Sequence, residues 1–326
     1  MPQVASLNYR AAWWCRSSHV QTCWPNIARR VPPIPWNRER LELPDGDFLD
    51  LDWHRAGSDR LLVISHGLEG SSRRVYITGL ARAAMRRGWD VLAWNFRGCS
   101  GEPNRLPRSY HSGATEDLEA VVGQAAVEGY RFLALAGFSL GGNMTLKYLG
   151  ENHPFQNRIA GAAVFSVPCH LRSAVIQMAS PECAFYMRRF LREMGPKMEA
   201  KRNQFGSAFP WSDWRSMRTF REFDDTFTAP LHGFRDAEDY WERCSSLRFL
   251  EHIHVPTLIL NAVDDPFLSQ ECYPREAVLR NPHLILEIPS QGGHVGFIGG
   301  GEFPGEYWSE YRALKFLDGL KESWGS

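Results

Sequence analysis

Short apolar runs recur along this chain, and segments with a helical distribution of apolar and polar residues separate them. The runs at 61–65, 91–95, 132–136, 159–167, 257–261 and 284–288 have the length and composition of buried β-strands. Helices are expected between and after them, at 75–87, 114–128, 142–149, 270–279 and 305–320. Because such alternation is typical of βαβ units, the pattern predicts an α/β fold, with a mostly parallel central sheet and helices on both faces.

The first part of the chain follows a different pattern. Residues 1–36 are rich in Trp, Pro and Arg and show no clear period, so they are expected to wrap the surface as an irregular N-terminal arm. Residues 41–43 and the alternating segment 48–53 flank the turn sequence PDGD, which predicts an antiparallel hairpin.

The alternation of predicted strands and helices stops after Pro168 and resumes near residue 256. We therefore predict a core built from residues 37–168 and 251–326, with residues 169–250 inserted as a helical cap. The cap carries many aromatic residues, which could line an apolar pocket against the core or fill the cap's own interior; these are Phe185, Tyr186, Phe190, Phe205, Phe209, Trp211 and Trp214.

Composition narrows the class of partner. Lys plus Arg and Asp plus Glu both number 37 in this 326-residue chain, so no basic excess exists to attract nucleic acid. The seven cysteines are scattered and odd in number, which favours a reducing compartment, and no run of 18 apolar residues suggests a membrane span. We expect a cytoplasmic protein that acts on a small molecule. The sequence carries no signal for an oligomeric state.

The segment Gly137-Phe138-Ser139-Leu140-Gly141 matches the G-x-S-x-G nucleophile elbow. In this elbow a sharp turn between a strand and a helix lifts a serine above the edge of the sheet. An apolar strand precedes the motif here and a helical segment follows it. We therefore predict that Ser139 is a nucleophile.

A serine hydroxyl needs a base to accept its proton, and the base needs an acid to orient it. His294 lies in a glycine-rich loop after the last predicted strand, and Asp264 and Asp265 follow the strand at 257–261. The chain order Ser, Asp, His is the order that the elbow motif requires. We favour Asp264 as the acid because it stands three residues past the strand, with Asp265 as the alternative; the other aspartate caps the next turn.

Acyl transfer also requires N–H donors for the developing oxyanion. The N–H of Leu140 follows the nucleophile directly and provides one donor. The turn at His66 and Gly67, after the strand at 61–65, is expected to present the N–H of Leu68 as the second. For His66 itself we favour a role in orienting this loop.

Several longer segments resemble the α/β-hydrolase superfamily and, more narrowly, its YheT-type branch, relatives of eukaryotic abhydrolase-domain esterases and yeast medium-chain acyl ester synthase/esterases. The segments are SSHVQT (17–22), HGLEG (66–70), NFRGCSGEPN (95–104), GFSLGGNMTLKYLGE (137–151), EFDDTFTAPLHGFRDAEDYW (222–241), PTLILNAVDDPF (256–267) and GGHVGF (292–297). The resemblance places the charge-relay serine at Ser139, the aspartate in the Asp264-Asp265 pair and the histidine at His294. It implies hydrolysis of carboxylic esters with short to medium acyl chains.

These observations together predict a serine esterase that forms an acyl-enzyme and uses neither a metal nor another cofactor. Three alternatives use the same fold. An alcohol could replace water, which would make the protein an acyltransferase; a thioester or peptide could replace the ester; or the fold could serve only to bind a ligand.

Overall fold

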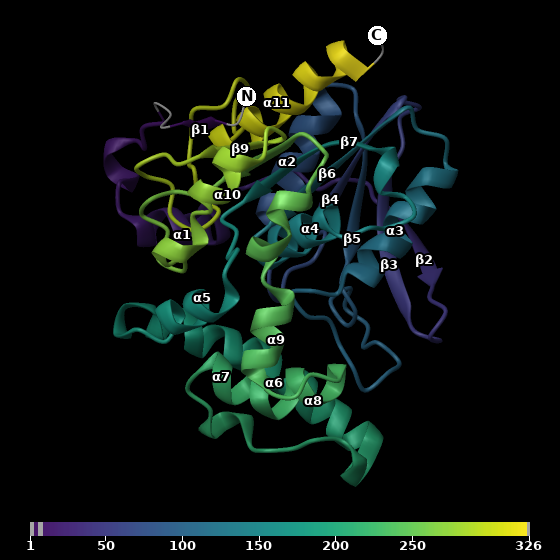
Figure 1. Ribbon diagram of the computed structural model, residues 1–326, viewed down its shortest axis with the longest axis vertical. Helices are drawn as coiled ribbons and strands as arrows, with labels where there is room; N and C mark the ends of the chain where they lie inside the picture. The colour runs from purple at the N-terminus through teal and green to yellow at the C-terminus, as the bar shows by residue number, and fades with distance from the viewer. Residues whose placement is uncertain (1–2, 6–8, 325–326) are drawn as a thin grey trace.

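The computed structural model describes residues 3–5 and 9–324, so parts of the expected arm, residues 1–2 and 6–8, lie outside the described residues, as do residues 325–326 (Figure 1). In the described chain, nine strands form one sheet in the order β1-β9-β8-β7-β6-β4-β5-β3-β2. The strands are β1 (Gln3–Ala5), β2 (Asn37–Glu42), β3 (Phe48–His54), β4 (Arg60–Ser65), β5 (Asp90–Asn95), β6 (Phe132–Phe138), β7 (Ile159–Phe165), β8 (Thr257–Leu260) and β9 (Leu284–Glu287).

Strand direction agrees with the pattern of the sequence. β2 pairs antiparallel with β3, and β3 antiparallel with β5, which confirms the predicted hairpin at one end of the sheet. The remaining pairs are parallel, from β5 and β4 through β6, β7, β8 and β9 to β1. The predicted α/β fold with a mostly parallel sheet is therefore confirmed.

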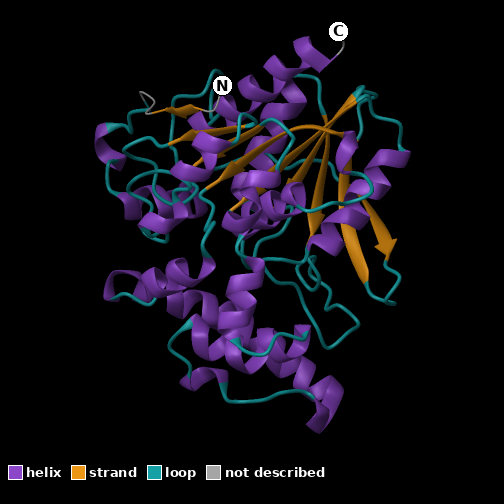
Figure 2. Cartoon of the chain, viewed as in Figure 1, coloured by secondary structure: helices purple, strands orange, loops and turns teal. Residues whose placement is uncertain are grey.

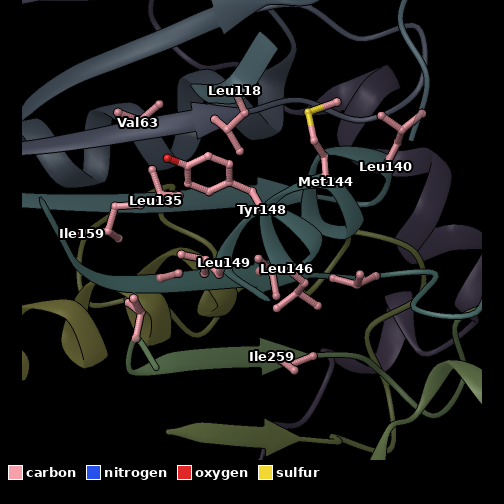
Figure 3. Close-up of a cluster of buried hydrophobic side chains, with 14 of the residues drawn as sticks. Val63, Leu118, Leu135, Leu140, Met144, Leu146, Tyr148, Leu149, Ile159 and Ile259 are labelled. Atoms are coloured by element: carbon pink, nitrogen blue, oxygen red, sulfur yellow. The ribbon is translucent and has the colours of Figure 1, made fainter. Parts of the chain in front are cut away.

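Helices cover both faces of the sheet, because the strands bury side chains on both sides. Along β4, Leu61 and Val63 belong to one apolar cluster, with α3 (Thr115–Val127), α4 (Leu140–Gly150) and α10 (Arg275–Arg280). Figure 3 shows α4 in this layer, with Leu118 and Val63 close to Tyr148. Leu62 and Ile64 belong to the other cluster, with α2 (Val75–Arg86) and α11 (Trp308–Trp324).

The segment between β7 and β8 is largely helical and lies as a separate layer at the end of the molecule away from both termini (Figures 1 and 2). Its helices are α5 (Leu171–Met178), α6 (Ala184–Phe205), α7 (Phe220–Phe223), α8 (Ala229–His232) and α9 (Ala237–Cys244), with a π-helical turn at Asp224–Thr228. The limits that we assign to a cap domain, 169 and 250, stay a prediction. None of the helices in the described ranges is long and apolar enough to cross a membrane.

The expectation of an irregular arm is wrong for part of residues 1–36. The segment contains β1, a 3₁₀ turn at Trp13–Cys15 and the eleven-residue helix α1 (Ser18–Ala28). Tertiary contact explains the helix: Gln21 and Thr22 are buried, and a Cβ on Gly293 would stand 2.5 Å from the Ser18 carbonyl oxygen. The apolar periodicity of the sequence did not predict this helix, because α1 buries polar residues and contains Pro25.

Candidate active site

Ser139 occupies the turn between β6 and α4 in a strained conformation. Its φ is +51° and its ψ is −116°, a region that non-glycine residues seldom adopt. Its backbone N–H donates to the Phe165 carbonyl at 2.8 Å, which ties the turn to β7. This is the geometry of a nucleophile elbow, with the serine side chain raised above the sheet edge.

The two glycines of the motif allow α4 to approach the sheet closely. A Cβ on Gly137 would stand 2.6 Å from the Gly141 carbonyl oxygen, and a Cβ on Gly141 would collide with the carbonyl oxygen of His66. Only glycine fits at these positions without displacing backbone. The spacing of the sequence motif therefore has a steric cause in this fold.

His294 pairs with Asp265 and not with the expected Asp264. His294 Nδ1 lies 2.9 Å from Asp265 Oδ2 and 3.1 Å from Oδ1, and the Asp265 side chain is fully buried. Asp264 Oδ1 instead accepts the Gly293 N–H at 2.9 Å. The preference for Asp264 is thus corrected: the chain turns after β8, with the Asp265 N–H on the Ala262 carbonyl, and adjacent side chains point to different partners.

Three consecutive backbone N–H groups fix the loop that carries His294. Gly293 donates to Asp264, His294 donates to Thr22 Oγ1 at 2.9 Å, and Val295 donates to Ser166 Oγ at 2.9 Å. The acceptors come from the loop after β8, from α1 and from the end of β7. Sequence reasoning missed Thr22 and Ser166 as supports of the site, although Thr22 closes the segment SSHVQT.

Ser139 and His294 line the same cavity, which has a volume of about 520 Å³. Among the described residues, neither Ser139 Oγ nor His294 Nε2 has a hydrogen-bond partner. Both atoms are therefore open to a ligand, and each stands on a backbone that is held in place. Catalytic hydrogen bonds often tighten only when substrate is bound.

Leu68 and Leu140, the residues of the predicted oxyanion donors, also line this cavity. Gly67 N–H donates to Tyr76 Oη at 3.1 Å and Glu69 N–H to Tyr110 Oη at 2.8 Å, while the N–H of Leu68 between them has no partner in the described chain. Leu140 begins α4, so its N–H lacks an intrahelical acceptor. The two tyrosines were missed by sequence reasoning, because no motif links a tyrosine hydroxyl to a backbone N–H that lies 9 or 41 residues earlier in the chain.

His66 holds this loop and is buried completely. Its Nδ1 lies 2.7 Å from the Gly67 carbonyl oxygen, and its Nε2 lies 3.1 Å from the Phe96 nitrogen. A carbonyl can only accept and an amide N–H can only donate, so Nδ1 carries the proton. Burial lowers the pKa of His66 to about 3, so the ring stays neutral. These contacts agree with a role in orienting the loop and leave His66 unavailable as a base.

The cap supplies most of the apolar lining of the cavity. Its contributions are Leu171, Ala174, Val175, Met178, Phe190, Met194, Met198, Phe220, Phe223, Phe227 and Leu231. Of the seven aromatic residues considered from sequence, only Phe190 is among them. Tyr186 and Phe209 are buried in the cap's own apolar cluster, Phe205, Trp211 and Trp214 pack against it, and Phe185 is exposed.

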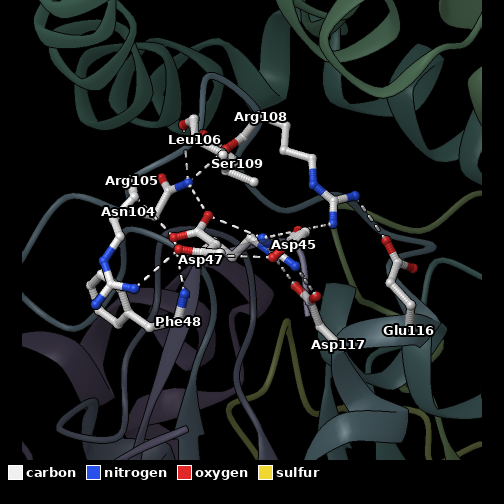
Figure 4. Close-up of polar contacts among 12 residues, drawn as sticks. Asp45, Asp47, Phe48, Asn104, Arg105, Leu106, Arg108, Ser109, Glu116 and Asp117 are labelled. Carbon is white, nitrogen blue, oxygen red and sulfur yellow. Dashed lines mark hydrogen bonds and ion pairs between the residues drawn. The ribbon is translucent and has the colours of Figure 1, made fainter. Parts of the chain in front are cut away.

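A polar network holds the loop between β5 and α3, which forms one wall of the cavity (Figure 4). Arg97 donates to Asp117 at 2.6 Å and to Asp47 at 3.0 Å, and all three side chains are buried. Asn104 Nδ2 donates to Asp47 at 2.7 Å and to the Arg108 carbonyl at 2.7 Å. The wall is therefore fixed to the core by charge-assisted hydrogen bonds.

Two lysines of α6 connect the cap to this edge of the core. Lys197 Nζ lies 2.6 Å from Glu69 Oε2, next to the Leu68 N–H. Lys201 donates to the carbonyls of Leu106 and Arg108 and is 4% exposed. Burial without a carboxylate contact lowers the pKa of Lys201 to about 8.

Among the described residues, no group of three or more His, Cys, Asp and Glu side chains is clustered so that it could hold a metal ion. The residues that line the cavity from the sheet edge include Ser139, His294, Leu68 and Leu140, which supply a hydroxyl, an imidazole and two backbone N–H groups without a partner in the described chain. Such a set suits nucleophilic attack on an acyl carbon, with proton transfer by the imidazole.

Comparison with known proteins places this geometry in a family. Residues 60–300 match the profile of the alpha/beta hydrolase fold family. The chain is 39% identical over 309 residues to YheT of Escherichia coli (strain K12), which carries an esterase name, covering 92% of this chain and 89% of that protein. The mouse protein named phospholipase ABHD3 is 30% identical over 309 residues, covering 91% of this chain and 75% of that protein.

A solved structure has the same fold at lower sequence similarity. The Pyrococcus furiosus esterase Pf2001 superposes with a TM-score of 0.59 at 19% identity, covering 97% of each chain. The fold, the match over residues 60–300 and the similarity to YheT agree with one another. This chain belongs to the α/β-hydrolase family, in the branch that contains YheT.

Proposed function

We propose that this protein is a serine esterase that hydrolyses carboxylic esters through an acyl-enzyme. One observation carries the proposal: Ser139 and His294 line one largely apolar cavity, and Asp265 binds His294 from behind, on a third loop. The family supports hydrolase chemistry, and the esterase name of YheT supports an ester as the substrate.

In the first half-reaction, Ser139 Oγ attacks the ester carbonyl carbon while His294 Nε2 accepts the hydroxyl proton. Asp265 holds Nδ1–H and stabilises the imidazolium that forms. The oxyanion lies against the N–H groups of Leu68 and Leu140, each worth about 3 kcal/mol in the transition state. Collapse of this intermediate expels the alcohol, which takes its proton from Nε2.

In the second half-reaction, His294 takes a proton from water, and the resulting hydroxide attacks the acyl carbon. Breakdown of the second tetrahedral intermediate releases the carboxylic acid and returns the proton to Ser139. An alcohol in place of water would give a new ester by the same steps. The balance between hydrolysis and transfer therefore depends on which nucleophile reaches the acyl-enzyme.

The apolar lining from the cap supports an acyl chain as the part of the substrate that the cavity holds. We propose esters with short to medium acyl chains as substrates. The phospholipase name of the mouse relative adds acyl esters of phospholipids to the compounds worth testing.

Because all seven cysteines, each within the described chain, are free thiols, we also propose that the protein resides in the cytoplasm.

The test is hydrolysis of p-nitrophenyl esters from acetate to decanoate by the wild type and Ser139→Ala. Removal of the nucleophile should lower kcat by about 10⁶-fold, to the detection limit. Ser207→Ala is the matched control, because Ser207 is an exposed serine of the cap outside the cavity lining. A fluorophosphonate probe should label the wild type and Ser207→Ala but not Ser139→Ala.

Two results would contradict the proposal. Equal turnover by the folded Ser139→Ala variant would exclude Ser139 as the nucleophile. Absence of both turnover and probe labelling in the folded wild type would favour a ligand-binding protein instead. Faster cleavage of acyl thioesters than of matched esters would change the substrate class but not the residues.

A further inference from the structure

The N-terminal segment between residues 10 and 30 presents large apolar side chains to solvent. Trp13 is 81% exposed and Ile27 79%, and Trp14 and Trp24 lie edge to face with ring centroids 5.2 Å apart. Among residues 9–320, the part of the chain for which side-chain burial is described, the exposed tryptophans all belong to this segment. Single exposed apolar residues are ordinary, but a cluster of this kind marks a binding surface.

The helix α1 shows that this exposure is built into the fold. Trp24 and Ile27 are three residues apart and therefore share one side of the helix. Thr22 on the opposite side and Gln21 on the flank between the two sides are buried, and they bind the backbone at His294 and Ile298. An ordinary surface helix buries its apolar side and exposes its polar side. α1 departs from this rule, because Trp24 and Ile27 are exposed while Gln21 and Thr22 are buried beside Pro25.

The charged residues of this segment of the chain have one sign. No Asp or Glu occurs in residues 9–38, although the whole chain is neutral. Arg29 is taken up by a buried ion pair with Glu310, at 2.6 Å. Arg10, Arg16 and Arg30 are exposed. We call the surface formed by these three arginines with Trp13, Trp14, Trp24 and Ile27 the arm surface.

We propose that the arm surface binds an anionic lipid bilayer. Tryptophan rings favour the level of the lipid headgroups, where their apolar bodies are buried and their N–H groups stay solvated. An aliphatic side chain such as Ile27 gains free energy by entering the acyl region, and arginines pair with lipid phosphates. A nucleic acid could also pair with the arginines through its phosphates, but it would leave Ile27 in contact with water. The presence of exposed arginines and exposed apolar side chains on one surface therefore favours a lipid bilayer.

The arm surface lies next to the junction of cap and core. His19 of α1 and Tyr186 of α6 are joined by a hydrogen bond of 2.9 Å, which connects the arm to the cap. Thr22 connects the same helix to His294. A bilayer on the arm surface would therefore lie close to the cavity, which suits esters that partition into lipid. This last consequence rests on the proposed function, whereas binding itself does not.

Sedimentation with vesicles tests the proposal without any readout of activity. The full chain is mixed with vesicles of phosphatidylcholine alone, or of equal parts phosphatidylcholine and phosphatidylglycerol. We expect binding to the anionic vesicles and much weaker binding to the zwitterionic ones. Binding should weaken as salt rises to 1 M, where the screening length falls to about 3 Å.

The apolar part is tested with Trp13→Ser/Ile27→Ser, because both side chains are so exposed that folding should not depend on them. Both side chains would be buried in the bilayer on binding, so their loss should weaken vesicle binding on the order of a hundredfold. The matched control is Val127→Ser/Leu279→Ser, which removes side chains that are 72% and 61% exposed elsewhere on the molecule. The control should bind like the wild type.

The basic part is tested with Arg10→Gln/Arg16→Gln/Arg30→Gln, which should weaken binding to the anionic vesicles roughly a hundredfold. Failure of the wild type to bind anionic vesicles would overturn the proposal, as would equal binding to both vesicles or equal loss in the control variant. Self-association abolished by Trp13→Ser/Ile27→Ser, without vesicle binding, would assign the arm surface to a second copy of the chain and also overturn it.

Discussion

The two sides of the cavity, the sheet edge of the core and the cap, are built in different ways. At the sheet edge the chain adopts strained conformations, with positive φ at Glu69, Ser139, Ser166, Val295 and Phe297. No other non-glycine residue in the described chain has a positive φ, and the cap contains none. The cap instead meets the cavity with apolar side chains on helices, among them several methionines.

This difference assigns separate tasks to the two sides. The core edge holds polar atoms in fixed positions, because neighbouring N–H groups are already bound while those of Leu68 and Leu140 are left open. Fixed dipoles are what stabilises developing charge. Methionine side chains adapt to the shape of an apolar ligand. We therefore expect changes at the core edge to lower kcat, and changes in the cap to alter substrate preference.

After the loss of Ser139 itself, the largest expected effect separates the two adjacent aspartates of the core edge. Asp265→Asn should lower kcat by about 10⁴-fold, since the neutral amide no longer favours the required tautomer of His294. Asp264→Asn keeps an oxygen that can accept the Gly293 N–H, so its kcat should fall less than tenfold. The measurement is kcat for one p-nitrophenyl ester in both variants. Similar losses in the two variants would contradict the pairing of His294 with Asp265.

The sheet and the elbow could be predicted from sequence because their signals are local. Buried strands require continuous apolar runs, and the elbow requires Gly137 and Gly141 because a Cβ at either would strike backbone. The apolar runs and the contact between Gly137 and Gly141 are local, and the contact of Gly141 with the His66 carbonyl is implied by the motif itself. Thus the strand positions and the place of Ser139 at a strand-to-helix turn could both be derived from the residues themselves.

The choice between Asp264 and Asp265 could not be predicted, because it depends on the turn after β8 and on a loop about 30 residues later. The helix in the N-terminal arm could not be predicted for a similar reason. Thr22 and Gln21 are buried by contact with a loop more than 270 residues away, and periodicity treats such polar residues as exposed. In both cases a distant partner decides the structure.

A smaller effect concerns Lys201, which connects the cap to a core loop. Its pKa is about 8 in the folded chain and about 10.4 when unfolded, so between these values the unfolded chain binds more protons. Stability contributed by this group must then rise with pH. Between pH 8 and about 10.4, the wild type should gain up to about 3 kcal/mol over Lys201→Met in unfolding free energy.

Urea unfolding of both proteins across this pH range measures the difference, and groups common to both proteins cancel. Below pH 8 the difference between wild type and Lys201→Met should stay constant, because Lys201 is then protonated in both states. If the unfolding free energies of the two proteins changed in parallel over the whole pH range, Lys201 would have an ordinary pKa in the folded chain.

The arm acts on the core edge through Thr22, and the next prediction tests that contact. Thr22→Val leaves the His294 N–H without its acceptor, and an unsatisfied donor costs about 1–3 kcal/mol. We expect kcat to fall roughly tenfold while KM changes less than twofold. Thr22→Ser keeps the oxygen and should restore kcat. If kcat fell equally in Thr22→Ser and Thr22→Val, the loss would come from the packing of the threonine methyl group and not from the hydrogen bond to His294.

The smallest effect tests the cap side of the comparison. Met194 lines the cavity from α6 and belongs to the cap's apolar cluster. Met194→Ala removes contact with the acyl chain only where the chain is long enough to reach it. For the octanoate ester, kcat/KM should fall about fivefold to tenfold, the effect of losing roughly 1 kcal/mol of apolar contact. For the acetate ester it should stay within twofold. An equal fall for both esters would mean that the cap also positions the reacting groups, and the division of tasks between cap and core would no longer hold.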